Sequence, residues 1–209
     1  MSSFSDSMSG LSPRMANKRI KKPVIVIICE GEKTEVIYFN DLKQLIGRQS
    51  PITIKTIRKT GVTPSRLVSY AKKMASDLDI DPGRGDQVWC VFDVDDRDDK
   101  EIHKTRCLAQ AKINLAISNP CFELWYLLHF EGSSGHLDQT QARRKLEKYI
   151  PGYQKNRSVM ADIQALLTNA IENAKFLRKY HKNNKTNVFS REGNPCTFVD
   201  QLVEQLPIS

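Results

Sequence analysis

The sequence predicts an α/β fold with a mostly parallel four-stranded sheet, helices on both faces and a helical C-terminal extension. Two observations predict this class. Short apolar runs rich in β-branched residues alternate with segments whose apolar residues recur at helical spacing. The runs are apolar nearly throughout, which is typical of parallel strands covered on both faces. We expect a disordered tail at residues 1–22, an α/β domain at 23–135 and the helical extension at 136–209, packed on the same domain.

The first strand and helix follow directly from the chain after the tail. Residues 24–29 (VIVIIC) form the first apolar run. Residues 34–46 then carry apolar side chains at helical spacing, with Thr34 as a candidate cap and Gly47 placed to end the helix. These segments predict one strand–helix unit.

A second unit follows with a different strand pattern. Residues 52–59 (ITIKTIRK) alternate apolar and polar residues at period two, which predicts an edge strand with one wetter face. Thr63 and Pro64 supply an N-cap and a first-turn proline, and an apolar stripe from Leu67 to Leu78 predicts a helix.

The third and fourth strands follow a turn at residues 81–86. Residues 87–96 (QVWCVFDVDD) form an apolar strand that ends in carboxylates, and a short helix is expected at 104–112. Residues 113–118 form the fourth run, after which Asn119 and Pro120 are expected to cap a helix over CFELWYLLHF. Helices are expected at 140–149, 159–180 and 197–206, the last capped by Thr197.

Composition narrows the class of protein. The formal net charge is +8 and the pI is near 9.3, which favours an anionic partner such as nucleic acid. No stretch approaches the roughly eighteen apolar residues of a membrane span, and the N-terminus has no apolar signal core, so we expect a cytoplasmic protein without a membrane partner. The 5 cysteines contain no C-x-x-C pair and are expected to be free thiols, mostly buried.

Carboxylates occupy the ends of two predicted strands. Glu30 ends the first strand, and Asp93 and Asp95 end the third. Ligands of open parallel sheets bind at the carboxyl ends of the strands, so these acids are expected at the functional edge. Two such charges about 4 Å apart repel by roughly 4 kcal/mol at an effective dielectric of 20, which a bound cation relieves. Oxygen ligands favour Mg²⁺ or Mn²⁺.

The sequence excludes three other kinds of phosphate or cation site. An EF-hand loop starting at Asp93 needs Gly and Glu where Asp98 and Lys104 stand. A phosphoacceptor receiver domain needs two adjacent acids after the first strand and a lysine after a fifth strand, and neither is found in this sequence. A Walker A motif is absent, so the chain is not itself a P-loop NTPase.

The segments "CEGEKTEVIYF", "FDVDDRDD", "SNPCFELWYLLHF" and "NPCTFVDQLVEQL" resemble the RloB-like family over about residues 23–206. The pattern of Glu30-Gly31 and Asp93-Val94-Asp95 also resembles the Toprim signature. The resemblance implies a Toprim-like fold and a role in prokaryotic anti-phage defence, often beside an ATPase partner. It further implies that Glu30, Asp93 and Asp95 bind Mg²⁺ or Mn²⁺ and catalyse phosphodiester cleavage in DNA or RNA. Glu35, or Glu32, is a candidate second acid of the kind that related nucleases use.

Further candidates surround this acidic set. Glu123 stands in an otherwise apolar helix that begins near the same edge, whereas His129 in that helix is expected to be a core residue. Lys33 is a candidate phosphate contact at the start of the first helix. Basic residues on two later helices are candidate nucleic-acid contacts: Arg143, Arg144, Lys145, Lys148, Lys179 and Lys182.

Three functions remain open from the sequence. The first is a metal-dependent nuclease in a defence system. The second is a non-catalytic interaction subunit of a complex that contains an ATPase. The third is a housekeeping Toprim enzyme that processes RNA.

Overall fold

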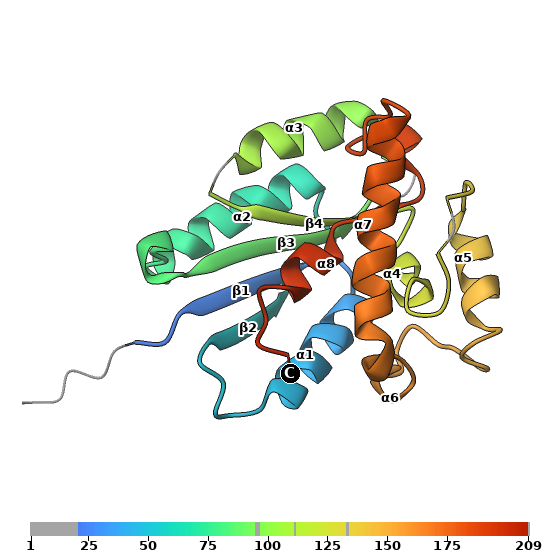
Figure 1. Ribbon diagram of the computed structural model, residues 1–209. Coiled ribbons are helices and arrows are strands. Elements are labelled where there is room, and N and C mark those ends of the chain that lie inside the picture. Colours follow the sequence, from blue (N-terminus) through green and yellow to red (C-terminus); the bar gives the residue numbers. More distant parts are fainter. Residues whose placement is uncertain (1–20, 95–96, 111, 133, 209) are drawn as a thin grey trace, which may run out of the picture.

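The computed structural model describes residues 21–94, 97–110, 112–132 and 134–208, so most of the predicted tail at residues 1–22 lies outside it. Within these ranges the chain forms a 5-stranded sheet in the order β2-β1-β3-β4-β5 (Figure 1). β1 to β4 are parallel, and β5 is antiparallel to β4. The strands are β1 (Val24–Cys29), β2 (Thr53–Arg58), β3 (Gln87–Asp93), β4 (Asn114–Asn119) and β5 (Cys196–Thr197).

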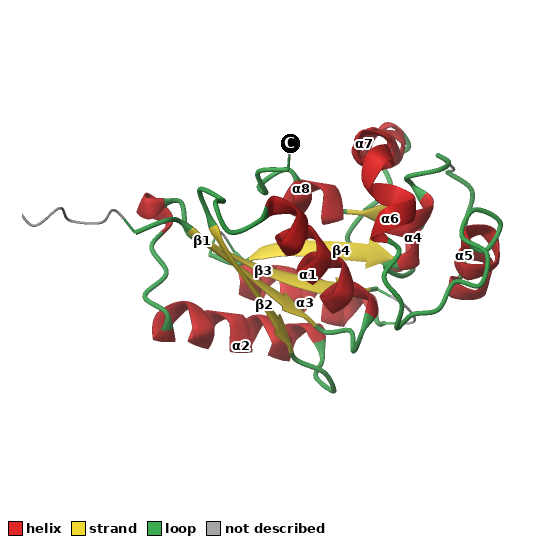
Figure 2. Ribbon diagram, turned by 90° about the horizontal axis from the view of Figure 1, so that it is seen from below, coloured by secondary structure: helices red, strands yellow, loops and turns green. Residues whose placement is uncertain are grey.

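Helices cover both faces of the sheet, as the sequence predicts. α2 and α3 lie on one face, and α1 and α8 lie on the other (Figures 1 and 2). α4, α5 and α7 stand beyond the carboxyl ends of the parallel strands. The helices are α1 (Thr34–Ile46), α2 (Pro64–Asp77), α3 (Asp99–Ala109), α4 (Glu123–Leu127), α5 (Gln139–Leu146), α6 (Met160–Ile163), α7 (Leu167–Asn183) and α8 (Val199–Val203).

The apolar run of β1 supplies both layers of the core. Ile25 and Ile27 pack with α1, α4 and α8, whereas Val26 and Ile28 pack with α2 and α3. Successive strand residues point to opposite faces, so a strand between two helical layers needs apolar residues at every position. β2 lies at the edge, as its alternating pattern predicts.

β5 corrects the predicted number of strands. The sequence predicts a helix from Thr197, but the structure pairs Thr197 with Ser118 of β4, and their hydroxyl groups lie 3.0 Å apart. The N–H of Phe198 donates to the carbonyl of Ile117 at 2.9 Å. A strand of 2 residues is too short to show a period-two pattern, which explains why the sequence did not reveal it.

Helix starts differ from the prediction in two places. Thr34 is the first residue of α1 rather than its cap, while Gly47 ends α1 with φ 73°, a conformation that glycine adopts readily. Asn119 does not cap a helix, because it ends β4 and its amide donates to the carbonyl of Ser190 at 3.0 Å. α4 begins only at Glu123 and is much shorter than predicted. The Thr63 and Pro64 start of α2 is confirmed.

The other helices follow the predicted order with shifted ends. α3 begins at Asp99 because Asp98 caps it, accepting from the N–H of Lys100 at 3.0 Å. α5 begins with a capping box between Asp138 and Gln141. The predicted helix at 159–180 is divided into α6 and α7 by the 3₁₀ turn Gln164–Leu166. None of the described helices has the length and apolar character of a membrane span.

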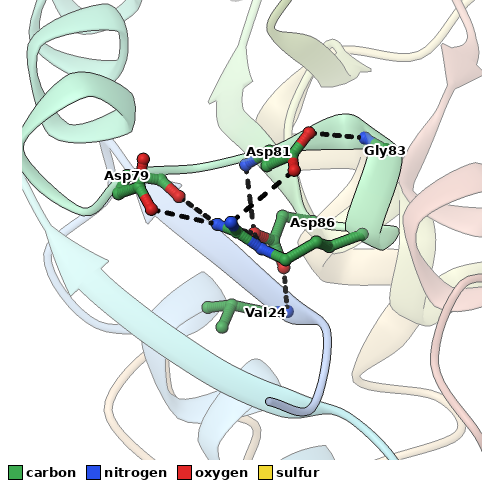
Figure 3. Close-up of polar contacts among 6 residues, drawn as sticks. Val24, Asp79, Asp81, Gly83 and Asp86 are labelled. Carbon is green, nitrogen blue, oxygen red and sulfur yellow. Dashed lines mark hydrogen bonds and ion pairs between the residues drawn. The ribbon is translucent and has the colours of Figure 1, made fainter. Parts of the chain in front are cut away.

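A second group of acids lies at the amino ends of the strands, in the turn before β3. Figure 3 shows Asp79, Asp81 and Asp86 gathered there, and all three pair with Arg84. Asp86 also accepts from the N–H groups of Val24 at 2.8 Å and Asp81 at 3.0 Å. Burial alone would raise the pKa of Asp86, but these N–H groups and the guanidinium lower it. The cluster therefore fastens β1 to the turn.

Candidate active site

Glu30 and Asp93 lie at the carboxyl ends of neighbouring strands. β1 pairs with β3 so that Cys29 is opposite Val91, and the N–H of Glu30 donates to the carbonyl of Val91 at 3.0 Å. Asp93 is the last residue of β3. Since neighbouring strands lie about 4.8 Å apart, the backbones of the two acids lie close together at this edge of the sheet. Asp95, the third predicted acid, lies outside the described residues.

A cavity of about 370 Å³ opens beside these strand ends. Its walls come from the β1–α1 loop, the end of β3, the start of α4 and the segment after α5, so residues distant in sequence meet there. Two further carboxylates, Glu35 and Glu123, reach this cavity together with Asp93. The lining residues are Gly31, Glu32, Lys33, Thr34, Glu35, Asp93, Phe122, Glu123 and Lys155.

Glu35 packs against the backbone of Gly31. Its side chain is in the first turn of α1 and is buried. A Cβ atom at Gly31 would lie 1.9 Å from Glu35 Oε2, so any other residue at this position would require the carboxylate to move. Burial and the nearby charges of Glu123 and Glu30 raise the pKa of Glu35, and Lys155 partly opposes them. Glu35 therefore holds its proton to higher pH than an ordinary glutamate.

Glu123 is buried with only 1% of its side chain exposed, yet its Oε1 has several polar partners. Its Oε1 accepts from Arg143 Nε at 3.3 Å and from the Tyr153 hydroxyl at 3.4 Å, and Lys155 Nζ lies 3.6 Å away. These partners explain how a carboxylate is tolerated in the apolar helix α4. The sequence-based prediction had placed Glu123 near this edge without identifying Tyr153 or Lys155.

Arg97 joins the two strand-end acids. Its Nη2 donates to Glu30 Oε1, and its Nε donates to the carbonyl oxygen of Asp93 at 3.0 Å. The guanidinium thereby compensates the charge of Glu30. Sequence reasoning missed Arg97, although it is the basic residue inside the acidic run "DVDDRDD".

Cys121 and His129 have no catalytic arrangement. Burial and the charges of Glu123 and Asp93 raise the pKa of the Cys121 thiol, which keeps it protonated and unreactive. His129 is a core residue, as expected: its ring packs on Trp125 with centroids 5.0 Å apart, and its Nδ1–H donates to the Trp125 carbonyl at 2.9 Å. Burial lowers the pKa of His129 to about 4.

The donor chemistry at the strand ends suits a hard divalent cation. Glu30 and Asp93 offer only oxygen atoms, the ligands that Mg²⁺ and Mn²⁺ prefer. Among the described residues, however, no three His, Cys, Asp or Glu side chains form a group that could hold a metal ion. Asp95 is the acid that the sequence adds to this pair, two residues after Asp93. The fit therefore rests on the donor type and on the adjacency of β1 and β3.

The predicted basic contacts separate in space. Arg143 and Lys33 line a second cavity of about 480 Å³, called here the basic cavity. Lys145 instead pairs with Glu131 at 2.8 Å. Four other exposed residues are not in its lining: Arg144 on α5, Lys148 just after α5, and Lys179 and Lys182 on α7. The basic cavity is lined by Lys33, Arg143, Glu147, Tyr153, Gln154, Lys155 and Asn156.

Fold and site together define an α/β protein whose parallel sheet carries acidic side chains at the carboxyl ends of adjacent strands. The chain belongs to the RloB-like protein family, whose model matches residues 25–206. No curated protein and no solved structure gives a significant match.

Proposed function

We propose that this protein is a Toprim-type nuclease that uses Mg²⁺ or Mn²⁺ to cleave phosphodiester bonds of DNA or RNA in an anti-phage defence system. One observation supports it most: Glu30 and Asp93 stand at the ends of adjacent strands, and the cavity beside them is lined by Asp93, Glu35 and Glu123. Cations at the rim of that cavity suit an anionic substrate. Membership of the RloB-like family is consistent with this role and with an ATPase partner.

Glu30, Asp93 and Asp95 would hold the metal. A bound divalent ion would polarise the phosphodiester group and offset its negative charge. Arg97, which pairs with Glu30 through Nη2, would be available to donate to a phosphate oxygen where Glu30 holds the metal. Burial raises the pKa of Glu35, which favours its protonated form and suits it to give a proton to the departing oxygen as a water molecule attacks the phosphorus.

The test is a cleavage assay with the full chain. Purified protein is incubated with Mg²⁺ or Mn²⁺ and single-stranded DNA, duplex DNA or tRNA. Glu30→Gln and Asp93→Asn are expected to lower the rate at least about 100-fold, because each removes a proposed metal ligand. Asp77→Asn, an exposed carboxylate at the end of α2, is the matched control and should cleave normally. Undiminished cleavage by both site variants would contradict the assignment.

The pairing of Arg97 with Glu30 favours a second candidate, the non-catalytic subunit of an ATPase-containing complex. In that case the ion pair is a structural contact, and the cavity is not a catalytic site. This candidate predicts no cleavage of any nucleic acid and phage defence that survives both Glu30→Gln and Asp93→Asn. Cleavage of tRNA without a role in defence would instead indicate a housekeeping RNA-processing enzyme.

A further inference from the structure

We propose that the basic cavity binds a backbone phosphate of the nucleic acid next to the phosphate that is cleaved. This inference deepens the proposed function and rests on it for the identity of the neighbouring site. The basic cavity and the carboxylate-lined cavity share Lys33 and Lys155, so they adjoin. A strand with one phosphate at the carboxylates therefore carries its next phosphate towards the basic cavity.

Lys33 and Arg143 in this cavity have hydrogen-bond donors that can contact a ligand. Lys33 is exposed at the start of α1, and within the described ranges its ammonium has no hydrogen-bond or ion-pair partner. Arg143 uses Nε for Glu123, and neither of its Nη groups has a partner in the described part of the chain. The side chains of Arg143 and Lys155 are 42% and 47% exposed, so both reach solvent.

Glu123 holds two of these cations in place. Arg143 and Lys155 both contact its Oε1, which fixes the separation of the two long side chains before a ligand arrives. Glu123 does not itself line the basic cavity; Glu147 is the carboxylate among the described lining residues. The cavity therefore presents an ordered excess of positive charge.

The rest of the lining favours a phosphate over a base. Gln154 and Asn156 are exposed amides that can donate to phosphate oxygens. The aromatic ring in the lining belongs to Tyr153, which is buried and directs its hydroxyl to Glu123, so it offers no open face for stacking. Contacts of this kind hold the backbone without reading sequence.

The test measures binding without cleavage. Full-length Asp93→Asn protein is titrated in EDTA with a fluorescent 12-nucleotide single strand of two unrelated sequences. Lys33→Ala, made in the Asp93→Asn background, should weaken the binding of both sequences equally. The expected loss is about tenfold, the factor for one charge-assisted contact. It should also reduce the salt dependence by about one counterion. Lys73→Ala, an exposed lysine on α2, removes the same charge elsewhere and should change binding less than twofold.

Two further variants guard against misfolding. Lys155→Ala should weaken binding like Lys33→Ala, and Lys155→Arg should restore it, with circular dichroism and melting unchanged for Lys33→Ala. Equal binding by the Lys33→Ala and Lys73→Ala proteins overturns the subsite, even if the wild-type protein cleaves. Loss of binding in a chain that never cleaves supports the subsite while the nuclease assignment fails. Lysine-dependent binding of inorganic phosphate, without binding of the oligonucleotide, overturns the backbone assignment.

Discussion

The acids of the candidate site differ in how their charge is compensated. Glu30 is paired with Arg97, and Glu123 with Arg143 and Lys155. Burial and the neighbouring acids disfavour the charged form of Glu35, whereas Lys155 favours it. Burial and the neighbouring acids therefore make ionisation of Glu35 unfavourable, and its protonation should be visible in the stability of the protein.

Glu35→Gln should stabilise the metal-free protein at neutral pH. Its pKa in the unfolded chain is near 4.5, and the raised value in the fold means that wild-type stability falls as the pH rises above 4.5 towards the folded pKa. Glutamine mimics the protonated acid, so the stability of the variant does not fall over this pH range. Urea unfolding in EDTA should show equal stabilities at pH 4 and a more stable variant at pH 7. A variant less stable at pH 7 would contradict the raised pKa.

His129→Phe should remove a loss of stability under acid conditions. Burial lowers the pKa of His129 from 6.5 to about 4, so the folded state resists the proton that the unfolded chain accepts. Wild-type stability from this group falls by about 1.4 kcal/mol per pH unit as the pH drops from 6.5 towards 4. Urea unfolding at pH 7, 6 and 5 should show a shallower decline in the variant. His103→Asn, at an exposed position on α3, should keep the wild-type slope.

At the level of elements, strands and helices with a clear period were predictable. β1, β3 and β4 are apolar runs, and α2 shows an apolar stripe beginning with a proline at its first position. The errors occur where tertiary contacts decide the backbone. β5 exists because the outer edge of β4 accepts Thr197, and α4 starts late because the side chain of Asn119 bonds to Ser190 and Arg191 carbonyls instead of a helix start.

α7 illustrates a basic helix whose charges have different roles. The sequence predicts nucleic-acid contacts at Lys179 and Lys182, whereas Arg178 on the same helix has a structural role. Arg178 makes two bonds to the buried carboxylate of Asp200, at 2.6 and 2.5 Å, and a third to the carbonyl of Thr197 at 2.6 Å. This pair fastens α7 to β5 and α8.

Arg178→Met should destabilise the protein by about 3–5 kcal/mol, because it leaves Asp200 buried without its cation. Lys175→Met is the matched control on the same helix. It removes an ion pair to Glu204 at 2.5 Å, whose side chains are 53% and 36% exposed, and should cost less than about 1 kcal/mol. Both values come from urea unfolding at pH 7. Similar losses for the two variants would show that the Arg178 pair is no more than a surface contact.

At the level of the whole molecule, the sheet order explains which part of the site the sequence anticipated. Parallel strands with acids at their ends predict a shared edge, and the adjacency of β1 and β3 puts Glu30 and Asp93 on neighbouring strands at that edge. Arg97, Tyr153 and Lys155 could not be placed in this way, because they come from segments without regular periodicity. Arg97 lies between β3 and α3, whereas the positions of Tyr153 and Lys155 depend on how the chain after α5 folds back over the strand ends.

A site of this kind should make global stability depend on divalent ions. Free Mg²⁺ or Mn²⁺ at 100 times its dissociation constant adds about 2.7 kcal/mol to a protein that binds it only when folded. Thermal melting of the wild-type chain should shift upwards with either ion, and Glu30→Gln should abolish the shift. Arg97→Gln should reach the same shift at lower ion concentration, because the metal no longer competes with a guanidinium for Glu30. An equal shift in wild-type and Glu30→Gln proteins would place the bound ion elsewhere, and Arg97 would then be a structural partner of β1.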